Sequence, residues 1–164
     1  MKPNKCVSCK SKKKQIIFGR NVYGGKRNQH FYKCSNCEII YLFPKINKKT
    51  EKIFYENNFH NFMNIRSKNE IKWNDPKKHA ISSRHEFLRR KKFLNINKLK
   101  HKKIIEIGSS SGFMLSPLKK NNKLFGVEPS KKYRDYTNSI GIETYEDLNY
   151  LIKNFKNYFD LIIH

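Results

Sequence analysis

The chain has 164 residues, of which 37% are hydrophobic, and it carries a formal net charge of +23 at pH 7. It has no apolar run long enough to span a bilayer, and its opening MKPNKCVSCK lacks the apolar core of a signal peptide. We therefore exclude the membrane-spanning class and expect a cytoplasmic protein.

The charge permits non-specific binding to nucleic acid. Because the Lys excess is spread along the chain beside many Asn and Ile residues, which share AT-rich codons, we favour a base-composition bias as its origin.

Residues 1 to about 45 contain all four cysteines, in the order C-x2-C, twenty-four residues, C-x2-C. Two residues between the members of a pair allow both thiolates to point inward, so two such turns supply a tetrahedron of sulfurs for structural zinc. The predicted ligands are Cys6, Cys9, Cys34 and Cys37. The alternatives are free thiols or two disulfides, which a reducing compartment disfavours.

The rest of this first segment is predicted to be a hairpin. Strands are expected at 15–18 and 30–33, with a glycine-containing loop between them that brings the two Cys pairs together. His30 is expected on the strand surface and not at the metal. Lys10 and Glu38 follow the two pairs, at positions where zinc knuckles often carry Gly.

Residues 46 to about 100 are predicted to be mainly helical. Thr50 is expected to cap a first helix. A second helix is indicated between residues 80 and 94, where apolar residues recur at roughly seven-residue spacing and so share one face. Trp73 lies in the polar stretch between these helices. It is expected to anchor packing, with a role in substrate binding as the alternative.

Residues 101 to 164 alternate between strand and helix patterns. The strands are expected at 103–107, 124–127, 142–145 and 159–163, and this alternation predicts an α/β fold with a parallel sheet and right-handed crossovers. Pro117 falls inside the first expected helix, so we predict a late helix start or a kink there.

The stretch KIIEIGSSSGF, residues 103–113, predicts a nucleoside site. A short buried strand leads into a loop of small residues, in which Gly108 permits a sharp turn and Gly112 allows close packing of the next helix. Glu128 ends the next strand, where its carboxylate can accept hydrogen bonds from a ribose diol. Ser110 and Phe113 replace two glycines of a dinucleotide fingerprint, and Glu106 would repel a pyrophosphate but suits a cationic ligand.

The pattern E-x-G-x-S-x-G, residues 106–112, resembles motif I of the class I S-adenosylmethionine-dependent methyltransferases, with Ser110 in place of the middle Gly. The Cys pairs and the following CEIIYLFPKINKKTEKIFYENNF resemble the members that carry an N-terminal zinc-binding segment, some of which modify sugars. The resemblance implies a Rossmann-like sheet ordered 3-2-1-4. It implies S-adenosylmethionine contacts from the loop and Glu128, a hydrophobic strand after the last Cys pair, and an adenine contact from Glu146 or Asp147.

The leading hypothesis is therefore the N-terminal portion of a zinc-containing methyltransferase, acting on a sugar or another small metabolite. Its three segments are 1–45, 46–100 and 101–164. The related domains have seven strands, so we expect a chain ending after strand four to be inactive alone. The catalytic base is unknown, and His164 is expected to be an ordinary strand-end residue. The alternative hypothesis is a basic zinc-ribbon protein that binds nucleic acid without catalysis.

Overall fold

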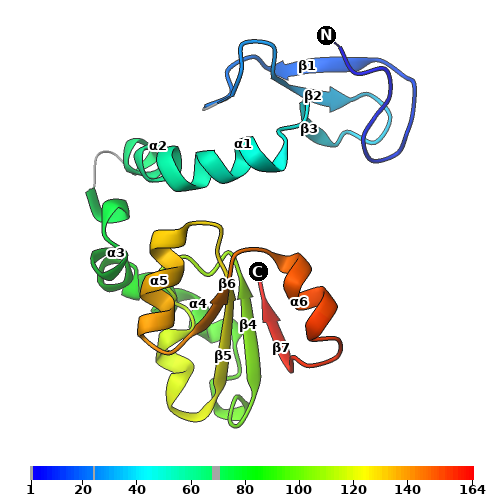
Figure 1. Cartoon of the computed structure of the whole chain (residues 1–164). Coiled ribbons are helices and arrows are strands. Elements are labelled where there is room, and N and C mark those ends of the chain that lie inside the picture. Colours follow the sequence, from blue (N-terminus) through cyan, green and yellow to red (C-terminus); the bar gives the residue numbers. More distant parts are fainter. Residues whose placement is uncertain (1, 24, 68–70) are drawn as a thin grey trace. The chain divides into compact units, whose positions relative to one another are not determined.

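The computed structural model describes residues 2–23, 25–67 and 71–164 (Figure 1). The chain divides into two compact units, Met1–Phe54 and Tyr55–His164. The first unit contains a three-stranded sheet and the second a four-stranded sheet, and each sheet has its own hydrophobic core. This division is coarser than the three segments expected from the sequence, which stay a prediction.

The first unit is built on an antiparallel sheet in the order β1-β2-β3. Its strands are β1 (Gln15–Gly19), β2 (His30–Cys34) and β3 (Ile40–Phe43). The two strands predicted from the sequence are confirmed, and β3 occupies the place of the hydrophobic strand implied after the last Cys pair. Burial alternates along β2, where Tyr32 and Cys34 face the core and Phe31 faces outward. One face of this sheet therefore covers the Cys cluster.

The helix that follows, α1 (Lys48–Ile53), begins earlier than predicted. Its N-cap is Asn47, whose side-chain oxygen accepts a hydrogen bond from the Thr50 amide at 2.8 Å. Thr50 is therefore inside the helix, and its prediction as the cap is wrong. Asn at position N-cap satisfies the amide at N3 as well as Thr does, so the spacing by itself could not choose between them.

The sheet of the second unit is parallel and has the order β6-β5-β4-β7. The strands are β4 (Lys103–Ile107), β5 (Lys123–Val127), β6 (Glu143–Tyr145) and β7 (Leu161–Ile163). Numbered along the chain, this is the predicted order 3-2-1-4. Ile104 and Ile105 of β4 are buried in two different core clusters, because successive side chains point to opposite faces of a sheet covered on both sides.

Helical segments precede the sheet and connect its strands. The α-helices are α2 (Phe59–Arg66), α3 (Pro76–Ser82), α4 (Arg84–Arg90), α5 (Lys131–Ser139) and α6 (Leu148–Asn154). The π-helix η1 (Phe54–Asn58) and the 3-10 segments η2 (Ile71–Asn74), η3 (Lys91–Phe93), η4 (Ile96–Lys98) and η5 (Ser116–Asn121) complete the set. Pro117 lies in the first turn of η5, so the predicted late helix start is confirmed.

The single helix predicted between residues 80 and 94 is two helices that meet at Ser83. Its apolar residues consequently do not share one buried face: Phe87 is 8% exposed, whereas Ile81 is 69% and Leu88 50% exposed. Asp75 caps α3 by accepting hydrogen bonds from two amides of the first turn. In the part of the chain that the structure describes, no helix has the length and apolarity needed to cross a membrane.

Candidate functional site

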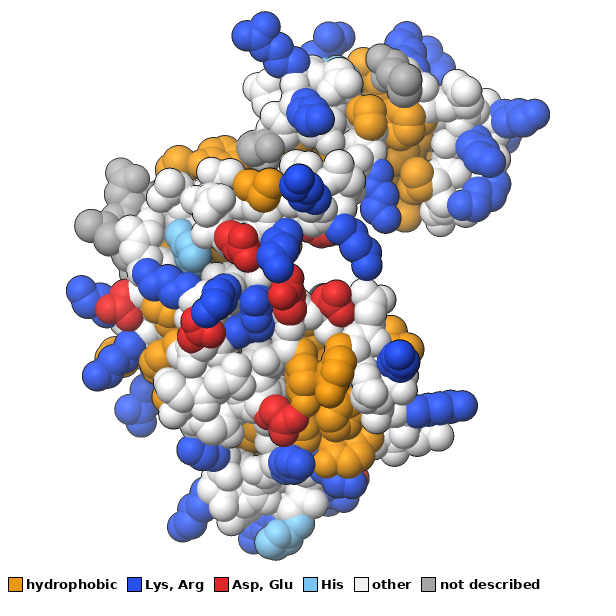
Figure 2. Space-filling view, viewed as in Figure 1, with side chains coloured by type: hydrophobic (Ala, Val, Ile, Leu, Met, Phe, Trp, Pro, Cys, Tyr) orange, Lys and Arg blue, Asp and Glu red, His pale blue; other side chains and the backbone are white. Residues whose placement is uncertain are grey.

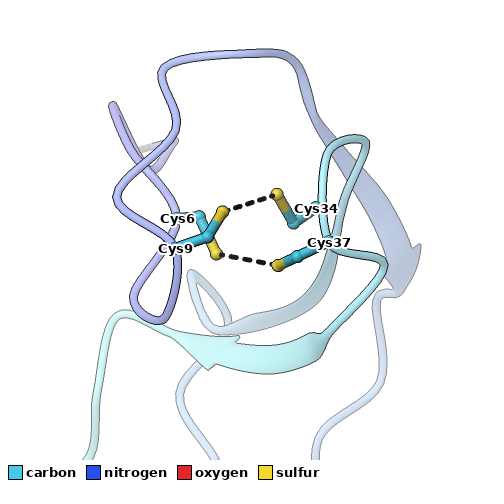
Figure 3. Close-up of side chains that lie close together, drawn as sticks. All are labelled: Cys6, Cys9, Cys34 and Cys37. Atoms are coloured by element: carbon cyan, nitrogen blue, oxygen red, sulfur yellow. Dashed lines mark hydrogen bonds between the residues drawn. The ribbon is translucent and has the colours of Figure 1, made fainter.

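The four cysteines of the first unit form one cluster (Figure 3). The Sγ atoms of Cys6 and Cys37 are 3.7 Å apart, those of Cys9 and Cys34 are 3.8 Å apart, and all four lie within 4.8 Å of one another. A tetrahedron with Zn–S bonds of about 2.3 Å has S–S edges of about 3.8 Å. Disulfide sulfurs are only about 2 Å apart. The cluster therefore fits a structural zinc site, and the disulfide alternative is wrong for this arrangement.

Both Cys pairs sit in turns of the same geometry. The Ser8 amide donates to Cys6 Sγ and the Asn36 amide to Cys34 Sγ, each at 3.4 Å. Lys10 and Glu38 have φ of 59° and 58°, the left-handed conformation that explains why Gly is common at these positions. Donation by the Cys37 and Asn36 amides lowers the pKa of Cys34 to about 6, which favours the thiolate.

His30, the histidine of the first unit, is not a member of the cluster. His30 begins β2, and its Nδ1 lies 3.1 Å from the Arg20 carbonyl oxygen. Among the described residues, the group able to hold a metal consists of the four cysteines alone. Four thiolates close a tetrahedral shell, so this site can stabilise the fold but offers no open position for catalysis.

The glycine-rich loop follows β4 in the second unit and turns back on itself. Gly108, Ser110 and Gly112 all have positive φ, at 77°, 47° and 67°. The amides of Gly108 and Ser109 donate to the Val127 carbonyl oxygen at the end of β5, at 2.8 and 3.0 Å. The loop is therefore held at the carboxyl end of the sheet, where parallel α/β folds bind their ligands.

The two glycines differ in what surrounds them. A Cβ added at Gly112 would lie 2.6 Å from Cδ1 of Ile142, whereas a Cβ added at Gly108 would have nothing within 4 Å. Gly112 is thus required by packing, as predicted. Gly108 is required by its backbone angle and leaves open space beside the loop.

Glu128 follows β5 directly and supports the loop. Its Oε2 accepts a hydrogen bond from the Ser110 amide at 2.9 Å, and its Oε1 accepts one from the Ser130 amide at 2.8 Å. The residue is 6% exposed. Burial raises the pKa of this carboxyl, while the Ser130 and Ser110 amides and the Arg134 guanidinium act in the opposite direction. The sequence placed Glu128 at the correct strand end but did not foresee its bonds to the loop.

Glu106 lies on β4, two residues before Gly108, and is also 6% exposed. Its Oε2 has no hydrogen-bond partner among the described residues, and the same holds for the buried hydroxyls of Ser109 and Ser110. Burial raises the pKa of Glu106 to about 8, with Arg90 lowering it and Glu128 raising it further. Buried polar atoms of this kind normally find a partner in water, an ion or a ligand.

The raised pKa of Glu106 predicts a pH-dependent stability for the second unit. In the unfolded chain the carboxyl releases its proton at about its ordinary value of 4.5, whereas the folded state holds the proton up to about 8. The free energy of unfolding should therefore fall as pH rises between these values. Urea unfolding followed by the fluorescence of Trp73 measures the stability of this unit, because Trp73 is the single Trp of the chain and lies in this unit. Glu106→Gln should reduce the dependence of the free energy of unfolding on pH, whereas Asp135→Asn, at an exposed position, should not. An equal pH dependence in Glu106→Gln and in the wild type would contradict the prediction.

Asp147 and Glu146 follow β6. The Asp147 side chain caps α6 by accepting from the Asn149 amide at 2.8 Å, and Glu146 lies 3.5 Å from the Arg134 guanidinium. Asp147 is therefore the N-cap of α6 and Glu146 precedes it, so the alternative that both acids lie in the first turn of the next helix is wrong. The adenine contact implied for this region stays a prediction.

His79 belongs to the site, although no sequence pattern marks it. It is 2% exposed; its Nδ1 lies 2.7 Å from the Ser111 hydroxyl and its Nε2 lies 3.3 Å from the Ser83 hydroxyl. The centroid of its ring is 3.9 Å from that of Trp73. His79 therefore ties α3 to the loop, and the packing role predicted for Trp73 is confirmed. The partner Ser111 is 32 residues away, which local patterns cannot reveal.

A pocket of about 410 Å³ lies beside His79, and its lining includes Phe113, the residue that follows the loop. Aromatic and basic side chains supply much of its wall: Trp73, His79 and Phe113, together with Arg66 and Arg90. Arg90 is also paired with Glu86, at 3.3 Å. Such a wall suits a ligand with an apolar or ring-shaped body and an anionic group.

No protein-family profile matches the chain, and no curated protein matches it in sequence. No family is therefore assigned. The four-cysteine cluster and the parallel four-stranded sheet with its helices are findings of the structure itself.

Proposed function

We propose that the second unit binds S-adenosylmethionine and is part of a methyltransferase. The observation that carries this proposal is the pair of buried carboxylates, Glu106 on β4 and Glu128 after β5, on either side of a loop with three positive φ angles. The strand order β6-β5-β4-β7 supports it, because the loop and both acids then gather at the carboxyl end of adjacent central strands.

The residues at the loop fit such a cofactor chemically. Each oxygen of Glu128 accepts one amide proton and retains a lone pair, so the carboxylate can also accept from ribose hydroxyls. A cationic group such as the cofactor's ammonium, bound directly or through water, would partner the free oxygen of Glu106 and favour release of the proton that burial retains on this carboxyl. The open space beside Gly108 allows a ligand to approach the backbone.

Bound S-adenosylmethionine supplies a methyl group on a sulfonium, for transfer to a nucleophilic oxygen, nitrogen or carbon. The protein's task is then mainly to align the acceptor with that group. The pocket lined by Trp73, His79 and Arg90 is our proposed acceptor site, because His79 contacts the Ser111 hydroxyl of the loop and Phe113, which follows the loop, also lines the pocket. Its wall favours a small metabolite with an anionic group, such as a sugar phosphate or a sugar acid, in keeping with the acceptor class implied by the resemblance.

Calorimetric titration with S-adenosylmethionine tests the proposal. Glu128→Ala should weaken binding by about ten-fold or more, because charge-assisted hydrogen bonds contribute about 1.5–3 kcal/mol each. Glu106→Gln should weaken it less, since it keeps a polar side chain of the same shape. Because Glu128 also supports the loop, the fluorescence of Trp73 during urea unfolding must first show that the variant is folded.

Two results would contradict the proposal. One is a folded Glu128→Ala variant with unchanged affinity, which would place the ribose elsewhere. The other is the absence of any binding of S-adenosylmethionine to the zinc-loaded wild type, which would remove the cofactor assignment itself.

A further inference from the structure

The three-stranded sheet of the first unit has an apolar outer face. The strand register forms two cross-strand rows on this face. The first row runs from Ile16 on β1 through Lys33 on β2 to Ile40 on β3, and the second runs from Gly19 through Phe31 to Leu42. These rows face away from the core, because Ile17, Tyr32 and Tyr41 between them pack on the Cys cluster. Phe18, at the irregularity in β1, is 63% exposed, and Ile16 and Ile40 are about half exposed. We call the residues Ile16, Phe18, Phe31, Lys33, Ile40 and Leu42 the outer face.

The unit that carries this face has a larger excess of basic over acidic residues than the rest of the chain. Residues 1–54 contain fourteen Lys and Arg but two Asp and Glu, whereas residues 55–164 contain twenty-two and eleven. The net charge is therefore +12 over the 54 residues of the first unit and +11 over the 110 residues of the second, so net positive charge per residue is about twice as high in the first unit. In Figure 2, Lys and Arg side chains project from this unit, and a patch of hydrophobic side chains lies between them.

We propose that the outer face binds single-stranded nucleic acid, with exposed rings stacking on bases and the surrounding cations contacting phosphates. Phe18 and Phe31 present aromatic surface, and stacking on such rings tolerates any base sequence. Lys33 lies between Ile16 and Ile40 in the first row, where its ammonium pairs with the exposed Glu38 carboxylate at 2.8 Å, and the Lys12–Lys14 run leads into β1. This function is separate from the proposed cofactor site, which lies in the other unit.

The positive charge of the first unit favours nucleic acid, and not a second copy of the chain, as the partner of the outer face. Two outer faces placed together would bring two strongly positive units into contact, and a zinc bound by four thiolates would remove only two charges from each. A polyanion instead releases its counterions on binding. Duplex bases are already stacked within the helix, so exposed rings favour an unpaired strand.

Fluorescence anisotropy of the zinc-loaded full chain with labelled oligothymidylate tests the proposal. Phe18→Ala/Phe31→Ala should weaken binding about ten-fold or more, whereas Phe18→Tyr/Phe31→Tyr should retain it. Phe93→Ala is the matched control, since Phe93 is 79% exposed but lies in the other unit, and it should leave affinity unchanged. Replacing Lys12, Lys13 and Lys14 by Ala should flatten the dependence of affinity on salt between about 50 and 200 mM.

A full zinc content shows that the first unit of a variant is folded. If the double variant loses zinc, the oligothymidylate affinity of the single Phe18→Ala variant is compared with that of the wild type instead. Equal affinity in the Ala variant and the wild type would overturn the proposal, as would equal affinity for a duplex competitor. A dimer that the Ala variant converts to a monomer would show instead that a second copy covers the face. Glu128→Ala should leave oligonucleotide binding unchanged, so this test and that of the cofactor site fail independently.

Discussion

Removal of zinc should unfold the first unit and leave the second unit folded. The core cluster of the first unit consists of Tyr32, Tyr41 and two of the cysteines, Cys6 and Cys34, with Ile17 and Phe43 at its margin. So few apolar side chains cannot offset the ordering of about fifty residues. Structural zinc supplies about 10–16 kcal/mol in small zinc-dependent folds, so its loss should abolish the folded state. Chelation should remove only the part of the near-ultraviolet dichroism that comes from the three tyrosines of the first unit, since the other six lie in the second, and it should leave the fluorescence of Trp73 in the second unit unchanged.

Cys34→Ser should reproduce the effect of chelation without a chelator. Cys34 is fully buried and its thiolate accepts the Asn36 amide, so a serine there removes a ligand and a core group together. Ser8→Ala, an exposed change within the first Cys turn, is the control and should retain one zinc per chain. Metal analysis that finds substoichiometric zinc in the wild type, or full zinc in Cys34→Ser, would refute a four-cysteine site.

Gly112→Ala should destabilise the second unit by about 2–5 kcal/mol. A side chain at positive φ costs about 1–2 kcal/mol, and overpacking a filled core adds about 1–3 kcal/mol. Both apply at Gly112, where φ is 67° and the new Cβ would meet Ile142 at 2.6 Å. Gly108→Ala is the matched control. Its φ is 77° but the space around it is open, so only the backbone cost applies and the free energy of unfolding should fall by about 1–2 kcal/mol.

A double-mutant cycle separates the two causes. Ile142→Val removes the Cδ1 atom that the new Cβ would contact, and by itself costs about 0.5–1.5 kcal/mol. If the clash is responsible, Gly112→Ala should cost about 1 kcal/mol less in the Ile142→Val background. Urea unfolding followed by Trp73 fluorescence measures all four proteins. Equal costs for the two Gly variants, or no coupling with Ile142, would show that backbone strain alone accounts for the loss.

Local spacing determined the features that depend on neighbouring residues in the chain. Two residues between paired cysteines define the turn, so the four ligands followed from the sequence, whereas the left-handed conformation of Lys10 and Glu38 came from the structure. Strand and helix alternation likewise predicted a parallel sheet, because parallel strands need crossover connections. The small-residue loop and the acid at the next strand end were predicted for the same reason: strand ends can be located from sequence, and parallel strands end at one edge.

Other features were decided only by tertiary contacts. The apolar spacing between residues 80 and 94 fits one helix equally well, yet the chain turns at Ser83, where His79 meets both the Ser83 and Ser111 hydroxyls. The hydrogen bond from Ser110 to Glu128 and the pocket beside Trp73 join residues far apart in the chain, and the burial that leaves an oxygen of Glu106 without a partner is likewise set by the folded sheet. The outer face of the small sheet became visible only when register set its rows, because a one-residue shift would reverse which side chains face solvent.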